Sequence, residues 1–270
     1  MRGLGIDFIS AFALPPVEYV ELAAELGAPT ISMGLNRMEY NPEGYAPFSL
    51  REDKALRREV KAALAATGVE IGIGENLLVA EGPIDLDGWR ADLDILSELG
   101  TRRVNSVSIE PDFAQNIDKY GALTELCQGY GIDVLIEFVP IFGVVDLQTA
   151  RAVVEKLGAP NCGLVIDTMH CGRTGITAAD LAQLPPELVG YIQLCDAPWK
   201  SELDYIDEAM HERRVPGEGE LPLREYLAAL PRDVIVSLEV PDRPRAEAGQ
   251  GPRERLAYAL GKGREILSSL

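Results

Sequence analysis

Four apolar segments in the second half of the chain each carry polar side chains at or near their end. They are VLIEFVP with Glu137, GLVIDTMH with Asp167 and His170, YIQLCDAP with Gln193 and Asp196, and VIVSLEVP with Glu239. Their length and β-branched content are typical of buried parallel strands. An unpaired carboxylate is costly to bury. Four strands that each deliver an oxygen ligand or an acid at the same end therefore predict a shared partner, and a divalent cation is the natural one.

Predicted strands and helices alternate through the whole chain. The runs that fit strands span residues 3–9, 30–34, 69–79, 102–109, 132–140, 163–169, 188–196 and 233–240. Eight strand–helix units in 270 residues, about 34 residues each, predict a single (β/α)8 TIM-barrel domain over residues 1–270. An open doubly wound sheet has the same alternation. No G-x-G-x-x-G follows the first strand, however, where a dinucleotide-binding sheet needs it.

A barrel places its functional groups at the carboxyl ends of the strands. Because the last four predicted strands are neighbours, we expect four of their side chains to form an arc around one side of the mouth, namely Glu137, Asp167, Gln193 and Glu239. Three carboxylates and an amide oxygen suit one Mn²⁺, Mg²⁺ or Co²⁺ ion. For any single acid of this set, a buried ion pair or a helix N-cap is an equally good interpretation.

Composition excludes several classes of function. The chain is 47% hydrophobic and 25% charged, as in an ordinary globular protein, and its net charge of −18 argues against a nucleic-acid partner. No run reaches the roughly 18 apolar residues of a membrane helix, so no membrane partner is expected, and no secretory signal is evident. The four cysteines show no paired spacing, which favours a reducing cytoplasm.

Three motifs resemble those of a known family. IDTMH (166–170) resembles a D-T-x-H motif, ERRVPGEGELP (212–222) resembles the R-x-x-P-G-x-G segment of ketose 3-epimerases, and SLEVP (237–241) resembles a final strand with a metal-binding glutamate. With these motifs the whole chain resembles the xylose isomerase-like TIM barrels, the group of sugar phosphate isomerases and epimerases.

The resemblance implies roles for individual residues. The implied metal ligands are Glu137, Asp167, Gln193 and Glu239. Glu137 and Glu239 would also form the acid/base pair on opposite faces of the substrate, and His170 and Arg213 would bind substrate oxygens. Arg213 and Arg214 are adjacent, and the sequence leaves open which of them faces the site.

One position departs from the epimerase pattern. Many isomerases and epimerases of the group have histidine where this chain has Gln193, and IQLCDAP is closer to the Q-L-A-D-A-P of 3-dehydroshikimate dehydratases. No histidine follows soon after Glu137, however, so a histidine base from that loop is missing. The alternative function is therefore a metal-dependent lyase that resembles 3-dehydroshikimate dehydratase or inosose dehydratase and uses the same site.

The same first step serves all of these reactions. A divalent metal that chelates a carbonyl and a neighbouring hydroxyl acidifies the adjacent C–H, and a carboxylate removes the proton to give an enediolate. Return of the proton gives an epimer or an isomer, whereas loss of a β-hydroxyl gives dehydration. We expect a small keto-sugar or hydroxy-ketone as substrate, with isomerisation or epimerisation as the first choice.

The sequence offers two further candidate site residues and bears on two other classes of protein. Asp196 is a candidate substrate-binding residue, and Glu75, at the end of the third strand, is expected to contact substrate or to pair with an arginine. Related AP endonucleases need a basic groove and many histidines, whereas this chain has 2 histidines. A metal-free binding barrel would have no need of the full acid set. The resemblance also leaves a homodimer open.

Overall fold

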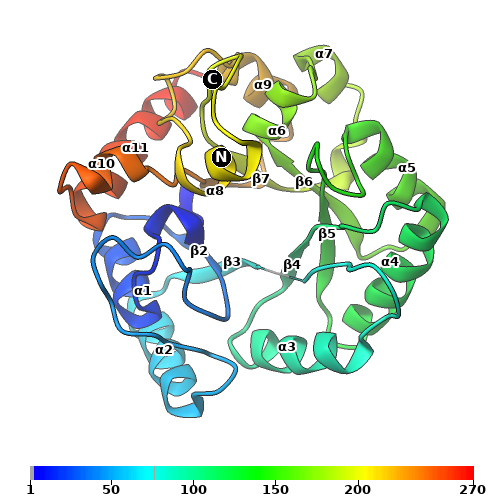
Figure 1. Ribbon diagram of the computed structural model, residues 1–270, viewed down its shortest axis with the longest axis horizontal. Coiled ribbons are helices and arrows are strands. Elements are labelled where there is room, and N and C mark those ends of the chain that lie inside the picture. Colours follow the sequence, from blue (N-terminus) through cyan, green and yellow to red (C-terminus); the bar gives the residue numbers. More distant parts are fainter. Residues whose placement is uncertain (1–2, 76) are drawn as a thin grey trace.

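The computed structural model describes residues 3–75 and 77–270. Within this part of the chain, eight parallel strands pair in chain order and close on themselves, because the last strand also pairs with the first. The predicted (β/α)8 TIM barrel is therefore confirmed (Figure 1). The strands are β1 (Gly5–Ile6), β2 (Thr30–Met33), β3 (Glu70–Gly74), β4 (Arg103–Ser106), β5 (Asp133–Glu137), β6 (Cys162–Asp167), β7 (Val189–Leu194) and β8 (Ile235–Leu238).

Helices surround the barrel (Figure 1), and their buried apolar side chains share one core cluster with those of the strands. The α-helices are α1 (Pro16–Glu25), α2 (Lys54–Thr67), α3 (Leu86–Glu98), α4 (Phe113–Gln128), α5 (Leu147–Leu157), α6 (Thr168–Arg173), α7 (Ala178–Leu181), α8 (Tyr205–His211), α9 (Leu223–Ala229), α10 (Arg243–Glu247) and α11 (Pro252–Ser268). Two short 3-10 helices are η1 (Phe8–Ala11) and η2 (Pro186–Leu188). Among the described residues, no helix combines the length and the apolar character needed to cross a bilayer.

Aspartate side chains set where several helices begin. The carboxylate of Asp53 accepts hydrogen bonds from the backbone N–H groups of Ala55 (2.8 Å) and Leu56 (2.9 Å). Helix α2 therefore begins at Lys54. Asp146 caps α5 through the backbone N–H of Thr149 (2.8 Å), as its position before the helix predicts.

Two short helices, α6 and α8, follow the carboxyl ends of β6 and β7. The strand expected over 163–169 ends at Asp167, because this carboxylate accepts the backbone N–H groups of Met169 (2.6 Å) and His170 (3.0 Å) and so begins α6. The segment after β7 contains α8, which Asp204 caps at the N–H of Ile206 (3.0 Å).

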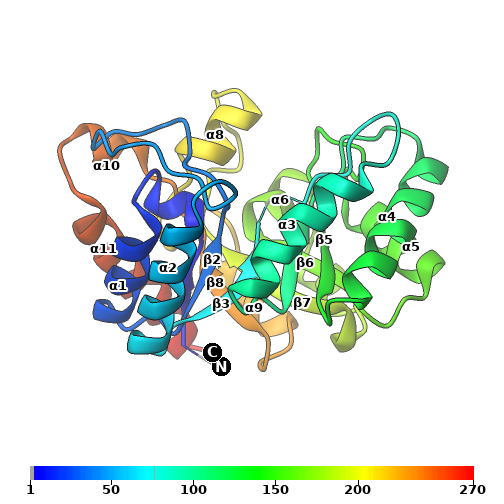
Figure 2. The same cartoon turned by 90° about the horizontal axis from the view of Figure 1, so that it is seen from below.

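The interior of the barrel is layered. A small buried cluster, separate from the core between strands and helices, consists of Ile73, Leu135, Val165, Tyr191 and Ile235. Since alternate residues of a strand face the same side, the side chains two positions further on form the next layer toward the carboxyl ends. Figure 2 shows that the chain termini lie at one end of the barrel and α8 at the other. The apolar cluster is therefore the floor beneath a polar mouth.

Candidate metal centre and active site

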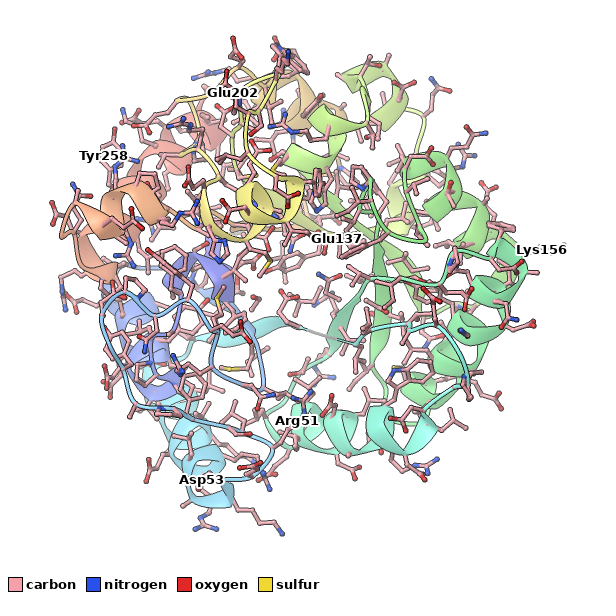
Figure 3. The ribbon with its side chains drawn as sticks, in the orientation of Figure 1. Arg51, Asp53, Glu137, Lys156, Glu202 and Tyr258 are labelled. Carbon is pink, nitrogen blue, oxygen red and sulfur yellow. The ribbon has the colours of Figure 1, made fainter. Side chains whose placement is uncertain are left out.

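Every strand of the barrel carries a polar side chain at or near its carboxyl end. In chain order these residues are Asp7, Ser32, Glu75, Asn105, Glu137, Asp167, Gln193 and Glu239. Several of them are joined by hydrogen bonds across neighbouring strands. In Figure 3 the side chain of Glu137 lies near the centre of the barrel, whereas Lys156 and Asp53 lie on its outside. The polar layer predicted from four strands thus extends around the whole mouth.

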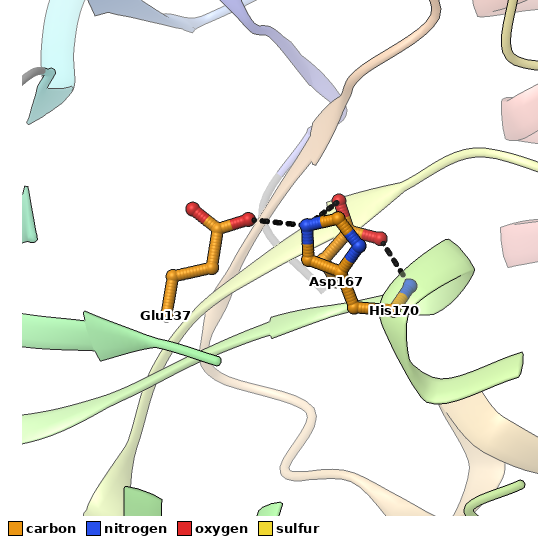
Figure 4. Close-up of side chains that lie close together, drawn as sticks. All are labelled: Glu137, Asp167 and His170. Atoms are coloured by element: carbon orange, nitrogen blue, oxygen red, sulfur yellow. Dashed lines mark hydrogen bonds and ion pairs between the residues drawn. The ribbon is translucent and has the colours of Figure 1, made fainter. Parts of the chain in front are cut away.

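Three potential ligand atoms meet on one side of this layer. Glu137 Oε1 lies 3.1 Å from His170 Nε2, and the same nitrogen lies 4.0 Å from Asp167 Oδ2 (Figure 4). One donor atom from each of these residues lies within 4.8 Å of the other two, and all three residues are buried. The structure therefore brings Glu137 and Asp167 together as predicted neighbours and adds His170 to them.

Arg213 joins the other two predicted acids. Its Nη1 donates to Asp167 Oδ2 and to Glu239 Oε2 (2.6 Å), and its Nε donates to the carbonyl of Ala209 (2.8 Å). The side chain of Arg213 is buried, whereas Arg214 is exposed. The structure thus identifies Arg213 as the arginine that faces the site.

The surroundings of Asp167 and Glu239 shift the pKa values of these two acids in opposite directions. Burial acts to raise the pKa of Asp167, but the charges of Arg213 and His170 outweigh burial and hold this pKa well below its ordinary value. Burial raises the pKa of Glu239 well above its ordinary value, and Arg213 only partly offsets this. Asp167 is therefore the firmly ionised member of the pair.

Gln193 completes the predicted set. Its side-chain N–H donates to Glu239 Oε1 (2.9 Å), while its Oε1 is buried and makes no hydrogen bond within the described part of the chain. A buried carbonyl oxygen next to carboxylates lacks compensation for its lost hydration. The four residues predicted as ligands thus lie in one connected cluster, with one oxygen available to a further partner.

His170 is held in one orientation by α8. The hydroxyl of Tyr205 lies 2.6 Å from His170 Nδ1, and the two rings are stacked with centroids 5.8 Å apart. If the tyrosine hydroxyl donates to Nδ1, the imidazole carries its proton on Nε2 and donates it toward Glu137. The sequence alone did not indicate Tyr205, because α8 lies in a segment without clear helical periodicity.

The opposite side of the mouth holds two acids of another kind. Asn105 Nδ2 donates to Glu75 Oε2 (3.1 Å) and to Glu137 Oε2 (2.5 Å), so Glu75 is paired with an amide and not with an arginine. Burial, together with the charges of Asp7 and Glu137, raises the pKa of Glu75 to about 8. Burial also raises the pKa of Asp7 to about 7, although Tyr191 donates a hydrogen bond to its Oδ1 (2.6 Å).

A cavity of about 190 Å³ lies above these groups. Its polar lining comprises Glu75, Asn105, Glu137, His170, Tyr205, Arg213 and Glu239. Its apolar lining comes from Phe8, Val107, Val139, Phe142, Ile206 and Met210, among others. Pockets for drug-sized ligands generally have volumes of about 300–1,000 Å³. This cavity therefore suits a smaller molecule and offers it both polar and apolar side chains.

Asp196 lies outside the cavity lining. Its carboxylate accepts backbone N–H groups from Ala197 (2.8 Å), Gly217 (2.9 Å) and Leu221 (3.1 Å). Both oxygens thus stabilise the P-G-E-G-E turn that follows Arg213. The substrate-binding role expected for Asp196 stays a prediction.

Two site residues could have been found by a rule that the sequence already offered. Asp7 follows the apolar run of the first strand, and Asn105 lies within RRVNSV of the fourth. Both fit the pattern of an apolar strand with a polar group near its end, which therefore holds in the first half of the chain as well.

Comparisons with known proteins agree with this architecture. The model of the xylose isomerase-like TIM barrel family matches residues 20–260. A 3-dehydroshikimate dehydratase of Pseudomonas aeruginosa is 26% identical over 183 residues, which are 63% of this chain and 29% of that protein. An inosose isomerase of Bacillus velezensis is 27% identical over 123 residues, which are 44% of this chain and 43% of that protein.

The chain thus spans less than half the length of either curated relative. Among solved structures, the IolI protein with a bound zinc atom superimposes with a TM-score of 0.82 at 18% identity, and the match covers 99% of each chain. At this identity the likeness concerns the fold.

Proposed function

The chain belongs to the xylose isomerase-like TIM barrel family, and on that premise we propose that it is a divalent-metal-dependent isomerase or epimerase of a small, uncharged keto-sugar or cyclic hydroxy-ketone. The resemblance that the sequence shows to this family is confirmed, and the curated relatives are enzymes. The observation that carries the proposal is the convergence of four oxygen-bearing side chains from β5 to β8 on one buried cluster. These side chains are Glu137, Asp167, Gln193 and Glu239.

The donor set fits a hard divalent cation. Three carboxylates and the buried amide oxygen of Gln193 offer the ligand type that Mn²⁺, Mg²⁺ and Co²⁺ prefer, and His170 Nε2 lies beside them. When bound, such a cation supplies Lewis-acid polarisation of a substrate carbonyl. The similar IolI structure contains a bound zinc atom, which supports a divalent metal in a barrel of this fold.

The residues around the cavity provide the proton chemistry. Glu137 and Glu239 both line the cavity; an ionised carboxylate there can take a proton from a carbon next to a polarised carbonyl, and a protonated carboxyl can return one. Asn105 and His170 each direct a polar nitrogen at Glu137, which fixes the direction of its carboxylate. Return of the proton to the other face of the same carbon gives epimerisation, and return to the neighbouring carbon gives isomerisation.

The charge of the cavity favours an uncharged substrate. Among the described residues that line it, Glu75, Glu137 and Glu239 are acidic, while the basic groups are His170 and Arg213. Arg213 is already bonded to two carboxylates and His170 faces a third. No lining cation is therefore available for a carboxylate or a phosphate. A neutral polyhydroxy ketone, such as the inosose named for one relative, fits better than dehydroshikimate, which carries a carboxylate.

A second candidate function is a lyase that removes water from such a neutral ketone. Its support is the amide of Gln193 at the metal cluster and the match of this chain to a 3-dehydroshikimate dehydratase. Elimination shares the first proton transfer and differs only in the departure of a β-hydroxyl, so the same carboxylates serve both reactions.

Proton exchange in D₂O tests the proposal. The chelator-treated protein is reloaded with Mn²⁺ and incubated with ketohexoses, inososes and dehydroshikimate, and deuterium incorporation is followed by NMR. We expect deuterium in a neutral ketone and its isomer, and loss of this activity in Glu137→Gln and Glu239→Gln with an unchanged circular dichroism spectrum. Glu155→Gln, on the exposed face of α5, is the control and keeps full activity.

Two results would count against the proposal. Near-native exchange in both Glu137→Gln and Glu239→Gln would refute the acid/base assignment. An unsaturated or aromatic product would favour the lyase instead.

A further inference from the structure

The side chain of Arg213 occupies oxygens that the proposed metal would use. Its Nη1 donates to Asp167 Oδ2 and, at 2.6 Å, to Glu239 Oε2. The three residues are 5%, 0% and 5% exposed, respectively, so water contributes little to their hydration. Glu239 Oε1 also accepts a hydrogen bond, from the side-chain N–H of Gln193 (2.9 Å). Two of the four proposed ligands therefore already share a cation of the chain itself.

Arg213 is fixed in this position from several sides. Its Nε donates to the carbonyl of Ala209 (2.8 Å), and its backbone N–H donates to the carbonyl of Pro241 (3.2 Å). Helix α8, which supplies Ala209, is itself anchored by the ion pair between the partly buried Arg173 and the buried Glu208. These contacts hold the guanidinium of Arg213 in one position within the site, whereas the side chain of a surface arginine rotates freely in water.

A fixed positive charge at these oxygens has a direct consequence for metal binding. A divalent cation that uses Asp167 and Glu239 must share their oxygens with the guanidinium or displace it. Both options cost free energy, because two like charges repel strongly where little water screens them. In the metal-free protein the same guanidinium stabilises the fold, since it offsets carboxylates that would otherwise be buried without a partner.

We propose that Arg213 is a built-in counter-ion that competes with the divalent cation for Asp167 and Glu239, so that the chain folds without metal and binds it more weakly than the carboxylates alone would. This inference rests on the proposed function, because it concerns the same metal cluster. It assigns to Arg213 a role in the metal-free protein that is separate from any contact with substrate.

Metal binding itself is the test, and it needs no substrate. Chelator-treated wild type, Arg213→Met, Arg213→Lys and Arg214→Met are titrated with Mn²⁺ by calorimetry, and each melting temperature is measured with and without Mn²⁺. We expect Arg213→Met to bind Mn²⁺ roughly tenfold or more tighter than wild type, within the usual range of coupling between charged groups. Its metal-free melting temperature should be lower, and its gain on adding Mn²⁺ larger.

The two other variants are matched controls. Arg213→Lys keeps the positive charge and should bind closer to wild type than Arg213→Met does. Arg214→Met removes the neighbouring, exposed charge and should bind like wild type. If Arg213→Met folds only with metal, it is purified with Mn²⁺, and the rate at which a chelator removes the ion is compared with wild type; slower release is expected.

The outcomes separate the two proposals. If wild type binds Mn²⁺ and Arg213→Met binds it no tighter or releases it no more slowly, the counter-ion role of Arg213 is refuted while the proposed function stands. If neither protein binds Mn²⁺, the metal dependence of the proposed function is refuted as well.

Discussion

The buried acid Glu75 gives the most direct test of the electrostatics of the mouth. Its Oε2 accepts a hydrogen bond from Asn105 (3.1 Å), and its Oε1 is buried without a hydrogen bond in the described part of the chain. Burial, with the charges of Asp7 and Glu137, raises the pKa of Glu75 from 4.5 to about 8. The substitution Glu75→Gln keeps the shape of the side chain and removes its titration.

The direction of the effect follows from proton linkage. Below about pH 4.5 the carboxyl is protonated in both the folded and the unfolded protein, so it has no pH-dependent effect. Between about pH 4.5 and 8 the folded protein retains a proton that the unfolded chain has released, and the free energy of unfolding of wild type falls. At about 1.4 kcal/mol per pH unit, the whole interval is worth on the order of 5 kcal/mol. This is an upper limit, because Glu75 is partly exposed to the cavity.

Urea denaturation of the chelator-treated proteins at a series of pH values measures this difference. We expect Glu75→Gln to gain stability relative to wild type by about 2–4 kcal/mol as pH rises from about 5 to 9. Glu70→Gln, at the exposed start of the same strand β3, is the matched control and should show no such gain. Parallel stability curves for wild type and Glu75→Gln, or a gain toward low pH, would refute the assignment of a retained proton to Glu75.

Two further predictions concern the supports of the site. Tyr205→Phe removes the 2.6 Å contact with His170 Nδ1 and should lower the free energy of unfolding by about 1 kcal/mol and shift the Nδ1 NMR signal. Tyr258→Phe, which loses an exposed hydrogen bond, is its control and should leave that signal unchanged. Asp196→Ala leaves three backbone N–H groups without their acceptor and should cost about 3 kcal/mol in thermal or urea unfolding. It should also make residues 216–221 sensitive to proteolysis, and a turn that stays resistant would contradict the role assigned to this carboxylate.

Much of the barrel could be predicted from the sequence because its strands obey a simple physical rule. A strand buried on both faces must be almost wholly apolar, so runs such as VLIEF and VIVSLEV can be predicted as strands. The polar residue near the end of each run indicates which end of the strand lies at the mouth of the barrel. The same rule placed Glu137 and Glu239 on one cavity, which the structure shows as lining residues of the same space.

The remainder depends on contacts between segments that are distant in the sequence. Helix α8 is only seven residues long, and its position over the cavity comes from ion pairs such as Arg243 with Asp207 (2.7 Å). No local sequence pattern indicates that Tyr205 contacts His170. Similarly, the choice between Arg213 and Arg214 depends on which of them meets Asp167, 46 positions earlier in the chain.

The two sides of the mouth compensate their buried acids by different means. On the side of β5 to β8, Asp167 and Glu239 share the guanidinium of Arg213, and Glu137 faces an imidazole. On the side of β1 to β3, the acids meet only hydroxyl and amide groups, and the raised pKa values of Asp7 and Glu75 mean that protons take the place of a cation. The proposed metal ion would therefore bind on the first side, where the carboxylates are already arranged around a positive charge. On the second side Glu75, which lines the cavity, then presents a protonated carboxyl group that can both donate a hydrogen bond to a hydroxyl of the proposed substrate and accept one.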